Sequence, residues 1–430
     1  MNAAARSGLA IAAACVLAAA GIANVAEGPV AALRPLQPLV DATPAGGELR
    51  IPPGSWAGPV VLRRPITLDG GGAATISGEG RGTVLRIETA GARVRGITIT
   101  GSGSNHDDVD AGIAIAGTGN VVEHVSIEDC LFGIDLAQAN DNVVRESRIH
   151  SKSRSTALRG DAIRLWYSFR NSITDNEISD TRDVVVWYSA DNLIARNRIE
   201  RGRYALHTMY AHHNRVEDND LRHNMTGVFL MYSDGVELRR NRILGAQGAT
   251  GVGIGFKESS AIVLEDNDIV YCATGVLLDV SPYEPDTTIR FARNRFAWNG
   301  VGVLFHNDWY GNEFVDNVFL GNFTQVAVRG GGAALRNRWS GNHWDDYQGF
   351  DRDRDGTGDT PYELRSYADR IWMESPPAAF FRASPLLEVI DFLDRLAPFS
   401  SPTVILRDDA PRFDAPRFEA RAPRAAGDRS

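Results

Sequence analysis

The segment Asn171-Ser-Ile-Thr-Asp-Asn-Glu-Ile178 recurs along the chain as Asn192-Leu-Ile-Ala-Arg-Asn-Arg-Ile199 and then as Asn214-Arg-Val-Glu-Asp-Asn-Asp-Leu221. The second asparagine of this phrase returns every 21 to 27 residues, at Asn176, Asn197, Asn219, Asn241, Asn267, Asn294 and Asn317. A repeat of this length is typical of a solenoid.

Within each repeat the apolar residues alternate over short runs, and Asn, Asp, Gly and Ser lie between the runs. This is the pattern of short strands joined by turns, and it does not fit helical repeats. The repeats therefore predict an all-β fold, a single right-handed parallel β-helix with coils of about 22 residues, over residues 27–350. An asparagine at a fixed place in each coil tolerates a left-handed turn, and stacked asparagines can hydrogen-bond along the helix axis.

The charge of the chain excludes one class of partner. The 430 residues carry a formal net charge of −9, and the isoelectric point is about 5.6. Proteins that bind duplex nucleic acid present a basic surface, so we expect no nucleic-acid partner.

The N-terminal residues have the pattern of an export signal. Arg6 supplies a positive charge, residues 9–20 form an apolar core, and Gly21-Ile-Ala23 offers small residues for cleavage. We interpret residues 1–26 as a signal peptide, because the apolar core is too short to span a bilayer. An uncleaved N-terminal anchor is the alternative.

Export exposes the cysteines to an oxidising compartment. Cys130 and Cys272 occupy the same place in their repeats but lie about six coils apart, which is too far for a disulfide. Two buried thiols are the expected state, and thiols that bind a metal are the alternative.

Aligning the repeats predicts two ladders of side chains. Trp166, Trp187, Met209 and Met231 fall on one ladder across neighbouring coils, and His207 shares the face of Met209. The next positions, Tyr167, Tyr188, Tyr210 and Tyr232, form a second ladder, which strand alternation would turn to the opposite face.

Soft metal ligands are concentrated in this part of the chain. Imidazole and thioether groups suit Cu(I), and a neighbouring aromatic face can shield the ion. The candidate copper ligands are His207, Met209, His212, His213, His223, Met225 and Met231. The alternative is that the Trp and Met ladder faces the core and that the histidines are turn residues.

A second metal motif follows the repeats. Asp351, Asp353, Asp355 and Asp359 stand at positions 1, 3, 5 and 9 of a loop with Gly356 at position 6. This spacing wraps oxygen ligands around Ca²⁺, with the carbonyl of Thr357 as a further ligand. Tyr362 replaces the usual glutamate at position 12, and a turn held by side-chain hydrogen bonds is the alternative.

The β-helix architecture is also that of pectate lyases and polygalacturonases. An exported polysaccharide lyase, a hydrolase or a carbohydrate-binding protein is therefore an alternative function. The repeats contain no Gly-His-Gly or Arg-x-Lys motif, and fold analogy alone is weak support.

The chain resembles the NosD family, the periplasmic copper-maturation factors of nitrous oxide reductase. The resemblance rests on the export signal, on the repeats with asparagine at fixed positions, and above all on Gly341-Asn-His-Trp-Asp-Asp-Tyr347 followed by the Asp-rich loop. It extends to Ser384–Phe399. It implies a non-enzymatic protein that is attached to an ATP-binding-cassette (ABC) transporter of the inner membrane. The implied partners are the transporter ATPase and permease, a copper-chaperone lipoprotein, and the reductase.

The C-terminal region is expected to contain one helix. Residues 351–383 form the Asp-rich loop and a connecting segment, and residues 384–398 combine an apolar stripe with Ser384-Pro385 at the start and Pro398 at the end. This helix either covers the open end of the solenoid or contacts the transporter or the membrane surface. Residues 399–430 are expected to be a disordered tail, in which residues 407–430 lack periodicity and either stay disordered or order only on a partner.

Overall fold

The computed structural model describes residues 32–248, 251–366, 373, 375–381, 384–396 and 403–414. The chain separates into a first unit, Met1–Leu33, and a second unit, Arg34–Ser430, which holds the described helices and strands. The predicted signal peptide, residues 1–26, lies outside the described residues. In the described part of the chain, no helix is long and apolar enough to cross a membrane.

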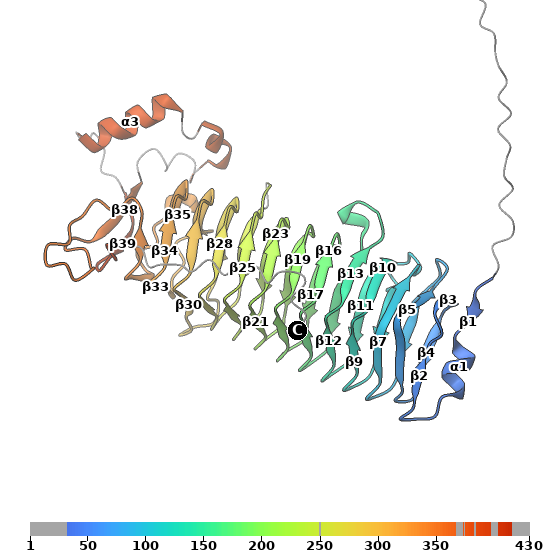
Figure 1. Ribbon diagram of the computed structural model, residues 1–430. Coiled ribbons are helices and arrows are strands. Elements are labelled where there is room, and N and C mark those ends of the chain that lie inside the picture. Colours follow the sequence, from blue (N-terminus) through green and yellow to red (C-terminus); the bar gives the residue numbers. More distant parts are fainter. Residues whose placement is uncertain are drawn as a thin grey trace, which may run out of the picture. The chain divides into compact units, whose positions relative to one another are not determined.

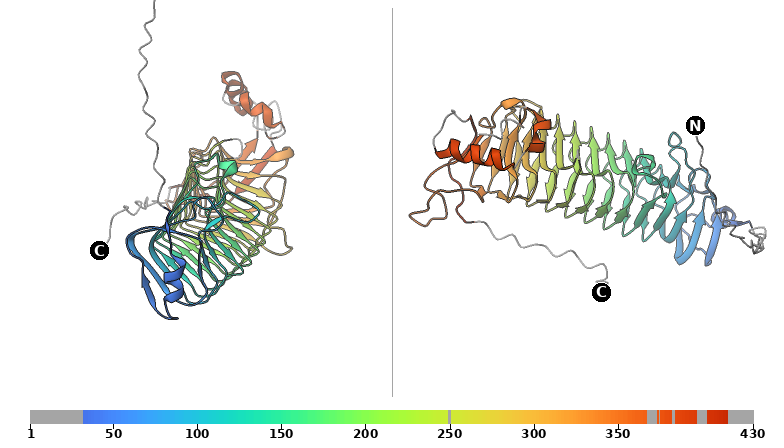
Figure 2. Two further views of the ribbon diagram at one scale, coloured as in Figure 1. Left: turned by 90° about the vertical axis from the view of Figure 1, so that its right-hand side faces the viewer. Right: turned by 90° about the horizontal axis from the view of Figure 1, so that it is seen from above.

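A typical coil of the second unit contains three short strands, as in β20 (Tyr204–Met209), β21 (Arg215–Glu217) and β22 (Asp220–Arg222). Each strand pairs in parallel with the equivalent strand of the next coil, so each side of the coil becomes a continuous sheet (Figures 1 and 2). The solenoid has about 13 turns, and the predicted parallel β-helix is confirmed.

One side of the solenoid is a parallel sheet of twelve strands. In chain order these are β4 (Val60–Leu62), β6 (Leu85–Ile87), β8 (Ala111–Ile115), β11 (Phe132–Ala137), β14 (Ile163–Trp166), β17 (Asp183–Trp187), β20, β23 (Thr226–Met231), β26 (Val252–Lys257), β29 (Thr274–Asp279), β32 (Val301–Phe305) and β35 (Thr324–Val328).

The other strands of the coils form two further ladders, which share the long strands β5 (Thr67–Ser77) and β7 (Arg93–Thr100). The first ladder contains β2 (Glu48–Arg50), β5, β7, β9 (Val121–Glu123), β12 (Val143–Arg145), β15 (Ser172–Thr174), β18 (Leu193–Ala195), β21, β24 (Glu237–Arg239), β27 (Val263–Glu265), β30 (Ile289–Ala292), β33 (Asn312–Val315) and β36 (Arg338–Ser340). The second contains β1 (Arg34–Pro35), β3 (Gly54–Ala57), β5, β7, β10 (Ser126–Cys130), β13 (Arg148–Ser151), β16 (Glu177–Ser179), β19 (Arg198–Glu200), β22, β25 (Arg242–Leu244), β28 (Asp268–Val270), β31 (Arg295–Ala297), β34 (Val318–Leu320) and β37 (His343–Trp344).

The repeated asparagines form the predicted ladder along the solenoid. Oδ1 of Asn197 accepts the backbone N–H of Asn176 at 3.1 Å and its side-chain amide at 3.0 Å. The side-chain amide of Asn197 in turn donates to the carbonyl of Ile173 and to Oδ1 of Asn219. Each asparagine therefore satisfies buried backbone groups at a corner, where the strand ladders do not reach.

Single residues in the left-handed conformation turn the chain at the corners. In one coil these residues are Tyr210 (φ 50°), His213 (φ 54°), Asp218 (φ 55°) and His223 (φ 52°). Such a residue swings its side chain outward, and pairs such as Asp175 and Arg196 bond across neighbouring coils at 2.9 Å. The corners consequently do not follow the alternation of the strands.

The interior is one continuous apolar core. Near its C-terminal end the core becomes aromatic, with Phe319 stacked on Trp344 at 4.2 Å and Trp344 on Tyr362 at 4.4 Å. Cys130 and Cys272 are free and buried, as predicted, and burial raises the pKa of each thiol to about 11.

Short helices accompany the solenoid. Helix α1 (Gln37–Ala42) buries Val40, and its Gln37 side chain bonds the backbone of Val61 in β4. The others whose bounds the structure describes are η1 (Thr156–Leu158), η2 (Arg329–Gly331), η3 (Pro376–Phe381) and α3 (Pro385–Leu396). The helix α3 agrees with the one expected over residues 384–398.

The C-terminal residues contain a strand that was not predicted. β39 (Thr403–Asp408) returns to pair antiparallel with β38 (Tyr362–Ser366), and both strands contribute side chains to the core. The expectation of disorder over residues 399–430 is therefore wrong for 403–408, because Ile405 and Leu406 are buried. Residues 415–430 lie outside the described residues.

Candidate metal centre

Three candidate copper ligands lie on the outer face of the twelve-stranded sheet. In β20, Leu206 and Thr208 are buried in the interior, and His207 and Met209 point the other way and are half-buried. The alternation in β23 leaves Met231 half-buried on the same outer face. The alternative that this ladder faces the core is therefore wrong.

The predicted ladder of Trp166, Trp187, Met209 and Met231 is confirmed. Trp187 is the register partner of Trp166 on one side and of Met209 on the other, and Met209 pairs with Met231. Neighbouring strands are about 4.8 Å apart, so each rung lies directly over the one before it. Lys257 follows Met231 in the same column.

His207 and Met231 are in contact although they belong to neighbouring coils. Nε2 of His207 lies 3.3 Å from Sδ of Met231. With metal bonds of roughly 2.0 Å to nitrogen and 2.3 Å to sulfur, and an angle of roughly 120°, two donors on one ion lie roughly 3.7 Å apart. A small opening of this contact is enough to admit an ion.

Two buried nitrogen atoms beside this contact lack a hydrogen-bond partner within the described residues: Nδ1 of His207 and Nε1 of Trp187. A buried polar group without a partner costs about 1–3 kcal/mol. Burial also lowers the pKa of His207, and the charge of Asp183 only partly opposes this. The imidazole is therefore neutral at neutral pH and offers a lone pair to a metal ion.

Aromatic rings enclose the imidazole. The indole of Trp187 meets the ring of His207 edge to face, with centroids 5.7 Å apart and planes at 89°. The ring of Tyr204 stacks on the imidazole of His207, with centroids 4.9 Å apart. Phe229 is the register partner of His207 in the next coil, and its ring lies 6.0 Å from that of Tyr204. These rings keep water away from much of the imidazole.

Buried carboxylates paired with arginines lie along the same sheet. Each pair joins neighbouring coils at 3.0 Å: Asp135 with Arg164, Asp161 with Arg182, and Asp183 with Arg203. Burial raises the pKa of Asp161 to about 6, although Arg182 opposes the shift. These carboxylates are engaged by guanidinium groups.

The other candidate copper ligands lie away from the His207–Met231 contact. His212 and His213 come after the corner that follows Met209, and Nδ1 of His212 accepts the N–H of Asp234 at 3.1 Å. His223 and Met225 precede β23, and a strand of that length separates Met225 from Met231 by roughly 20 Å. Met225 therefore does not lie at the contact of His207 with Met231, and copper binding by His212, His213 and His223 stays a prediction.

The tyrosine ladder forms, but on the same outer surface as the Trp and Met ladder. Tyr167, Tyr188, Tyr210 and Tyr232 stack with ring centroids 5.0, 5.2 and 4.8 Å apart. Their φ angles of 48–50° place them at a left-handed corner, where strand alternation has ended. The prediction that they face the opposite way is wrong for this reason.

The comparisons with known proteins concern the same coils. Residues 145–349 match the family described as "Periplasmic copper-binding protein (NosD)", and this span contains all the strands of the candidate site. The chain is also 30% identical to the "Probable ABC transporter binding protein NosD" of Pseudomonas aeruginosa, over 92% of this chain and 97% of the relative. The chain belongs to the NosD family. A second NosD-family relative, from Stutzerimonas stutzeri, is 34% identical over 26% of each chain.

Membership of the NosD family confirms the predicted periplasmic location. The family description names a copper-binding protein, and the relatives are named as transporter-binding proteins rather than as enzymes. The NosD-family resemblance recognised in the sequence is thus confirmed.

Solved structures share the fold of this NosD-family chain at low sequence identity. The A-module of the mannuronan C-5 epimerase AlgE6 from Azotobacter vinelandii has a TM-score of 0.54 and 17% identity, and the match covers 69% of this chain and 90% of that one. The catalytic domain of a GH87 α-1,3-glucanase has a TM-score of 0.52 and 16% identity, over 68% of this chain and 64% of that one. Likeness at this level of identity shows the fold alone.

The Asp-rich loop of this NosD-family protein lies just beyond the matched span. Ligand oxygens of Asp351, Asp353 and Asp355 all lie within 4.8 Å of one another. Oδ2 of Asp359 instead accepts the backbone N–H of Arg352 at 2.9 Å. The N–H of Thr357 donates to Asp355. Three of the predicted calcium ligands are thus placed together, and the binding of Ca²⁺ stays a prediction.

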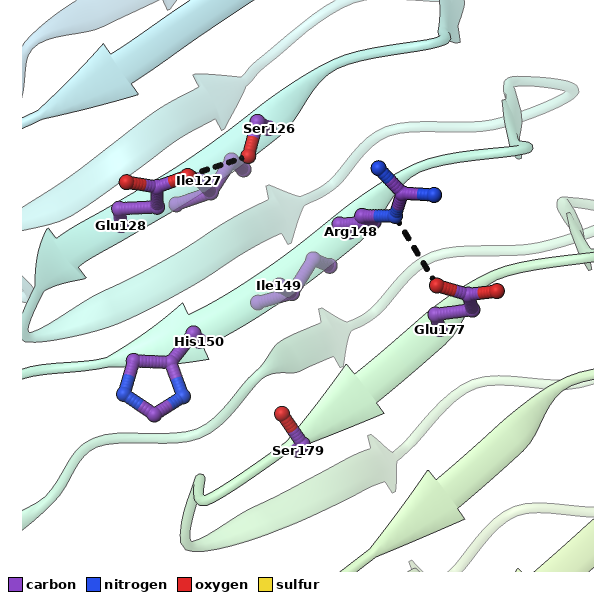
Figure 3. A pocket seen from close by; sticks show the side chains of 8 residues that line it. All are labelled: Ser126, Ile127, Glu128, Arg148, Ile149, His150, Glu177 and Ser179. Atoms are coloured by element: carbon purple, nitrogen blue, oxygen red, sulfur yellow. Dashed lines mark hydrogen bonds and ion pairs between the residues drawn. The ribbon is translucent and has the colours of Figure 1, made fainter. Parts of the chain in front are cut away.

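A separate hollow of about 360 Å³ lies over β10, β13 and β16, in one of the other strand ladders (Figure 3). Its side chains bond mainly one another: Arg148 with Glu177 at 3.0 Å, and Ser126 with Glu128 at 2.8 Å. This hollow has no part in the candidate copper site.

Sequence reasoning singled out the candidate ligands His207, Met209 and Met231, but it missed two aromatic residues beside them. Tyr204 and Phe229 were not singled out, because single aromatic residues in a strand are common. The repeat contains a usable signal, since His207 and Phe229 are 22 residues apart and so occupy one column. Reading all columns of the repeat, and not only those with unusual residues, would have placed both rings beside the imidazole.

Proposed function

We propose that this protein is the periplasmic accessory protein of an ABC transporter complex, and that it assists the delivery of copper to nitrous oxide reductase and the maturation of that enzyme. The observation that carries the proposal is the contact of His207 with Met231, beside Met209, on the outer face of coils that match a copper-binding family. Copper is here a cargo that is received and passed on.

The ligand set favours Cu(I). Thioether sulfur and neutral imidazole are soft or intermediate donors, and they bind Cu(I) better than the hard ions Mg²⁺ and Ca²⁺. His207, Met209 and Met231 are half-buried on an outer face, so a donor protein can reach them. Side chains that pointed into the core would be out of reach. We propose a copper-chaperone lipoprotein as the source and the reductase as the destination.

Attachment to the transporter is proposed to involve α3. Its residues Leu386, Val389, Phe392, Leu393 and Leu396 are all exposed, by 47% to 70%. Large apolar side chains grouped on an exposed helix mark an interaction surface. The name of the relatives, ABC transporter binding protein, points to the permease and the ATPase as the partners, with the protein held peripherally at the inner membrane.

A polysaccharide lyase or hydrolase receives less support. The solved sugar-active structures share only the fold, at 16–17% identity. Asp161 and Asp183 lie on neighbouring coils, but each is buried and bonded to an arginine. A catalytic acid or base has to reach the substrate, and these two carboxylates are committed to Arg182 and Arg203.

For the Asp-rich loop we propose a structural Ca²⁺ ion. The ligands would be Asp351, Asp353 and Asp355, with Asp359 turning from its backbone bond and the Thr357 carbonyl joining them.

The test of the copper function is the double substitution Met209→Leu and Met231→Leu, which keeps volume and apolar character. Reductase produced beside this variant is expected to contain less copper, measured by elemental analysis of the purified enzyme. Met225→Leu is the matched control, because Met225 is 48% exposed and lies away from the site. A full copper complement in reductase made beside the double variant would refute the proposed role of this face.

A further inference from the structure

We infer that Trp187 determines the specificity of the copper site, because its indole forms a cation–π wall that favours Cu(I) over Cu(II). This inference rests on the proposed binding of copper at His207, Met209 and Met231, and it adds a residue that supplies no ligand atom.

The position of Trp187 follows from the strand register. Trp187, Met209 and Met231 occupy one column on three successive coils, so Met209 lies between the other two. His207 contacts both ends of this column: its ring lies 5.7 Å from that of Trp187, and its Nε2 lies 3.3 Å from Sδ of Met231. The imidazole of His207 therefore extends across Met209. We expect an ion bound by His207 and the two methionines to have the indole of Trp187 on the side of the preceding coil.

The indole of Trp187 makes its contacts through the aromatic ring and not through its N–H group. Nε1 of Trp187 is buried and has no hydrogen-bond partner among the residues that the structure describes. The indole instead packs edge to face against His207 and against Trp166, whose ring lies 6.0 Å away at 65°. Tryptophan offers a cation the strongest attraction among the aromatic side chains.

The surroundings of His207 favour a copper ion of low charge. Tyr204 and Phe229 add apolar walls around His207, and the nearby carboxylate of Asp183 is bonded to Arg203. Cu(II) prefers nitrogen and oxygen ligands in a tetragonal arrangement, whereas Cu(I) accepts two sulfurs and one nitrogen without water. An aromatic face adds attraction for such a poorly hydrated cation and supplies no ligand that Cu(II) would prefer.

The test measures the binding of Cu(I) to the full-length purified protein by competition with a chromophoric Cu(I) chelator. Trp187→Leu is expected to weaken Cu(I) binding about 5- to 30-fold. Trp187→Phe keeps an aromatic ring of weaker attraction and is expected to fall between Trp187→Leu and the wild type. Cu(II) binding, titrated separately, should change by less than Cu(I) binding.

Trp166→Leu is the matched control, because Trp166 occupies the same column one coil further from the ligands. It should leave Cu(I) binding within about twofold of the wild type, in line with a difference below 0.5 kcal/mol. The wild-type near-ultraviolet spectrum should also change on Cu(I) addition, and Trp187→Phe should lose this change. That readout follows contact of the ion with the indole and remains available if Trp187→Leu does not fold.

The outcomes separate the two proposals. Equal Cu(I) affinity in the wild type and in the Met209→Leu, Met231→Leu variant overturns the copper site itself. Loss of binding in that variant, with unchanged affinity and an unchanged spectral response in Trp187→Phe, overturns only the role of Trp187. Equal losses in Trp187→Leu and Trp166→Leu also overturn it, since they indicate a general packing effect.

Discussion

The carboxylate of Asp408 closes the asparagine ladder at Asn342. Its Oδ2 accepts the backbone N–H of Asn342 at 3.1 Å and the side-chain amide at 2.9 Å, as the next asparagine would do. The same oxygen accepts a hydrogen bond from Nε1 of Trp344 at 3.2 Å, and Asp408 is fully buried. A residue 66 positions away in sequence thus completes the repeat.

We expect Asp408→Ala to destabilise the protein by about 2–4 kcal/mol, because it leaves buried donors of Asn342 and Trp344 without an acceptor. Asp408→Asn keeps one accepting oxygen and should cost less. The measurement is urea unfolding followed by circular dichroism. Equal stability of Asp408→Ala and the wild type would show that water replaces the carboxylate at no cost.

The buried carboxyl of Asp161 gives a prediction about pH. Burial raises its pKa from 3.8 to about 6, so the folded protein holds this proton more tightly than the unfolded chain does. The resulting stability is complete below pH 3.8 and is lost as the pH rises through 6. Relative to Asp161→Asn, the wild type should therefore lose up to about 3 kcal/mol between pH 4 and pH 7.5.

Asp141 offers a control of the opposite sign. Its hydrogen bond from Arg170 lowers the pKa of this exposed carboxyl, so its contribution is present at neutral pH and is lost on acidification. Asp141→Asn should change the pH profile in the reverse direction and by less. Parallel profiles for the wild type and Asp161→Asn, measured by urea unfolding at each pH, would contradict the Asp161 prediction.

The Asp-rich loop should make the stability of the protein depend on Ca²⁺. At 100 times the dissociation constant, a bound ion adds about 2.7 kcal/mol, which raises the melting temperature by several degrees. Replacing Asp353 and Asp355 together by Ala should remove both this gain and the effect of a chelator. Replacing the exposed pair Asp107 and Asp108 by Ala should leave the gain in place. An identical melting temperature of the wild type with Ca²⁺ and with chelator would contradict a calcium site.

The exposed side chains of α3 should affect assembly without affecting folding. Leu386 is 70% exposed and Phe392 is 59% exposed, so Leu386→Glu with Phe392→Glu should leave the melting temperature unchanged. The same variant should lose co-purification with the permease, measured by affinity capture from solubilised membranes. Leu158→Glu, at a 57% exposed position outside α3, is the control and should retain the permease. Retention of the permease by the α3 variant would exclude this surface.

The fold could be predicted because one side chain performs the same task in successive coils from Asn176 to Asn342. Asn197 and its equivalents satisfy buried backbone groups at a corner, so asparagine is required at a constant spacing. That spacing fixes the register, and the register in turn fixes which residues stack. The ladder from Trp166 to Met231 could therefore be predicted correctly from residue numbers alone.

The errors arise where the chain departs from strand geometry. Tyr210 and His223 have positive φ angles, and no alternation rule tells on which side a corner residue lies. The contact of His207 with Met231 needed side-chain directions that spacing does not give, since His207 leans to the next coil. β39 was missed because its partner Tyr362 is 46 residues from Asp408 in sequence, and local patterns carry no information about such a pairing.

The position of Asp408 has a consequence for biogenesis. Exported chains emerge with the N-terminus first, and a solenoid adds each coil on the preceding one. The coils that hold His207 and Met231 therefore enter the periplasm before residues 403–413, and until those residues arrive Asn342 and the last strands present an open edge. Open edges recruit other strands, so we expect residues 403–408 to protect the end of the solenoid from aggregation. A message truncated before codon 403 should thus yield a protein that keeps the candidate metal ligands in register and yet aggregates during secretion.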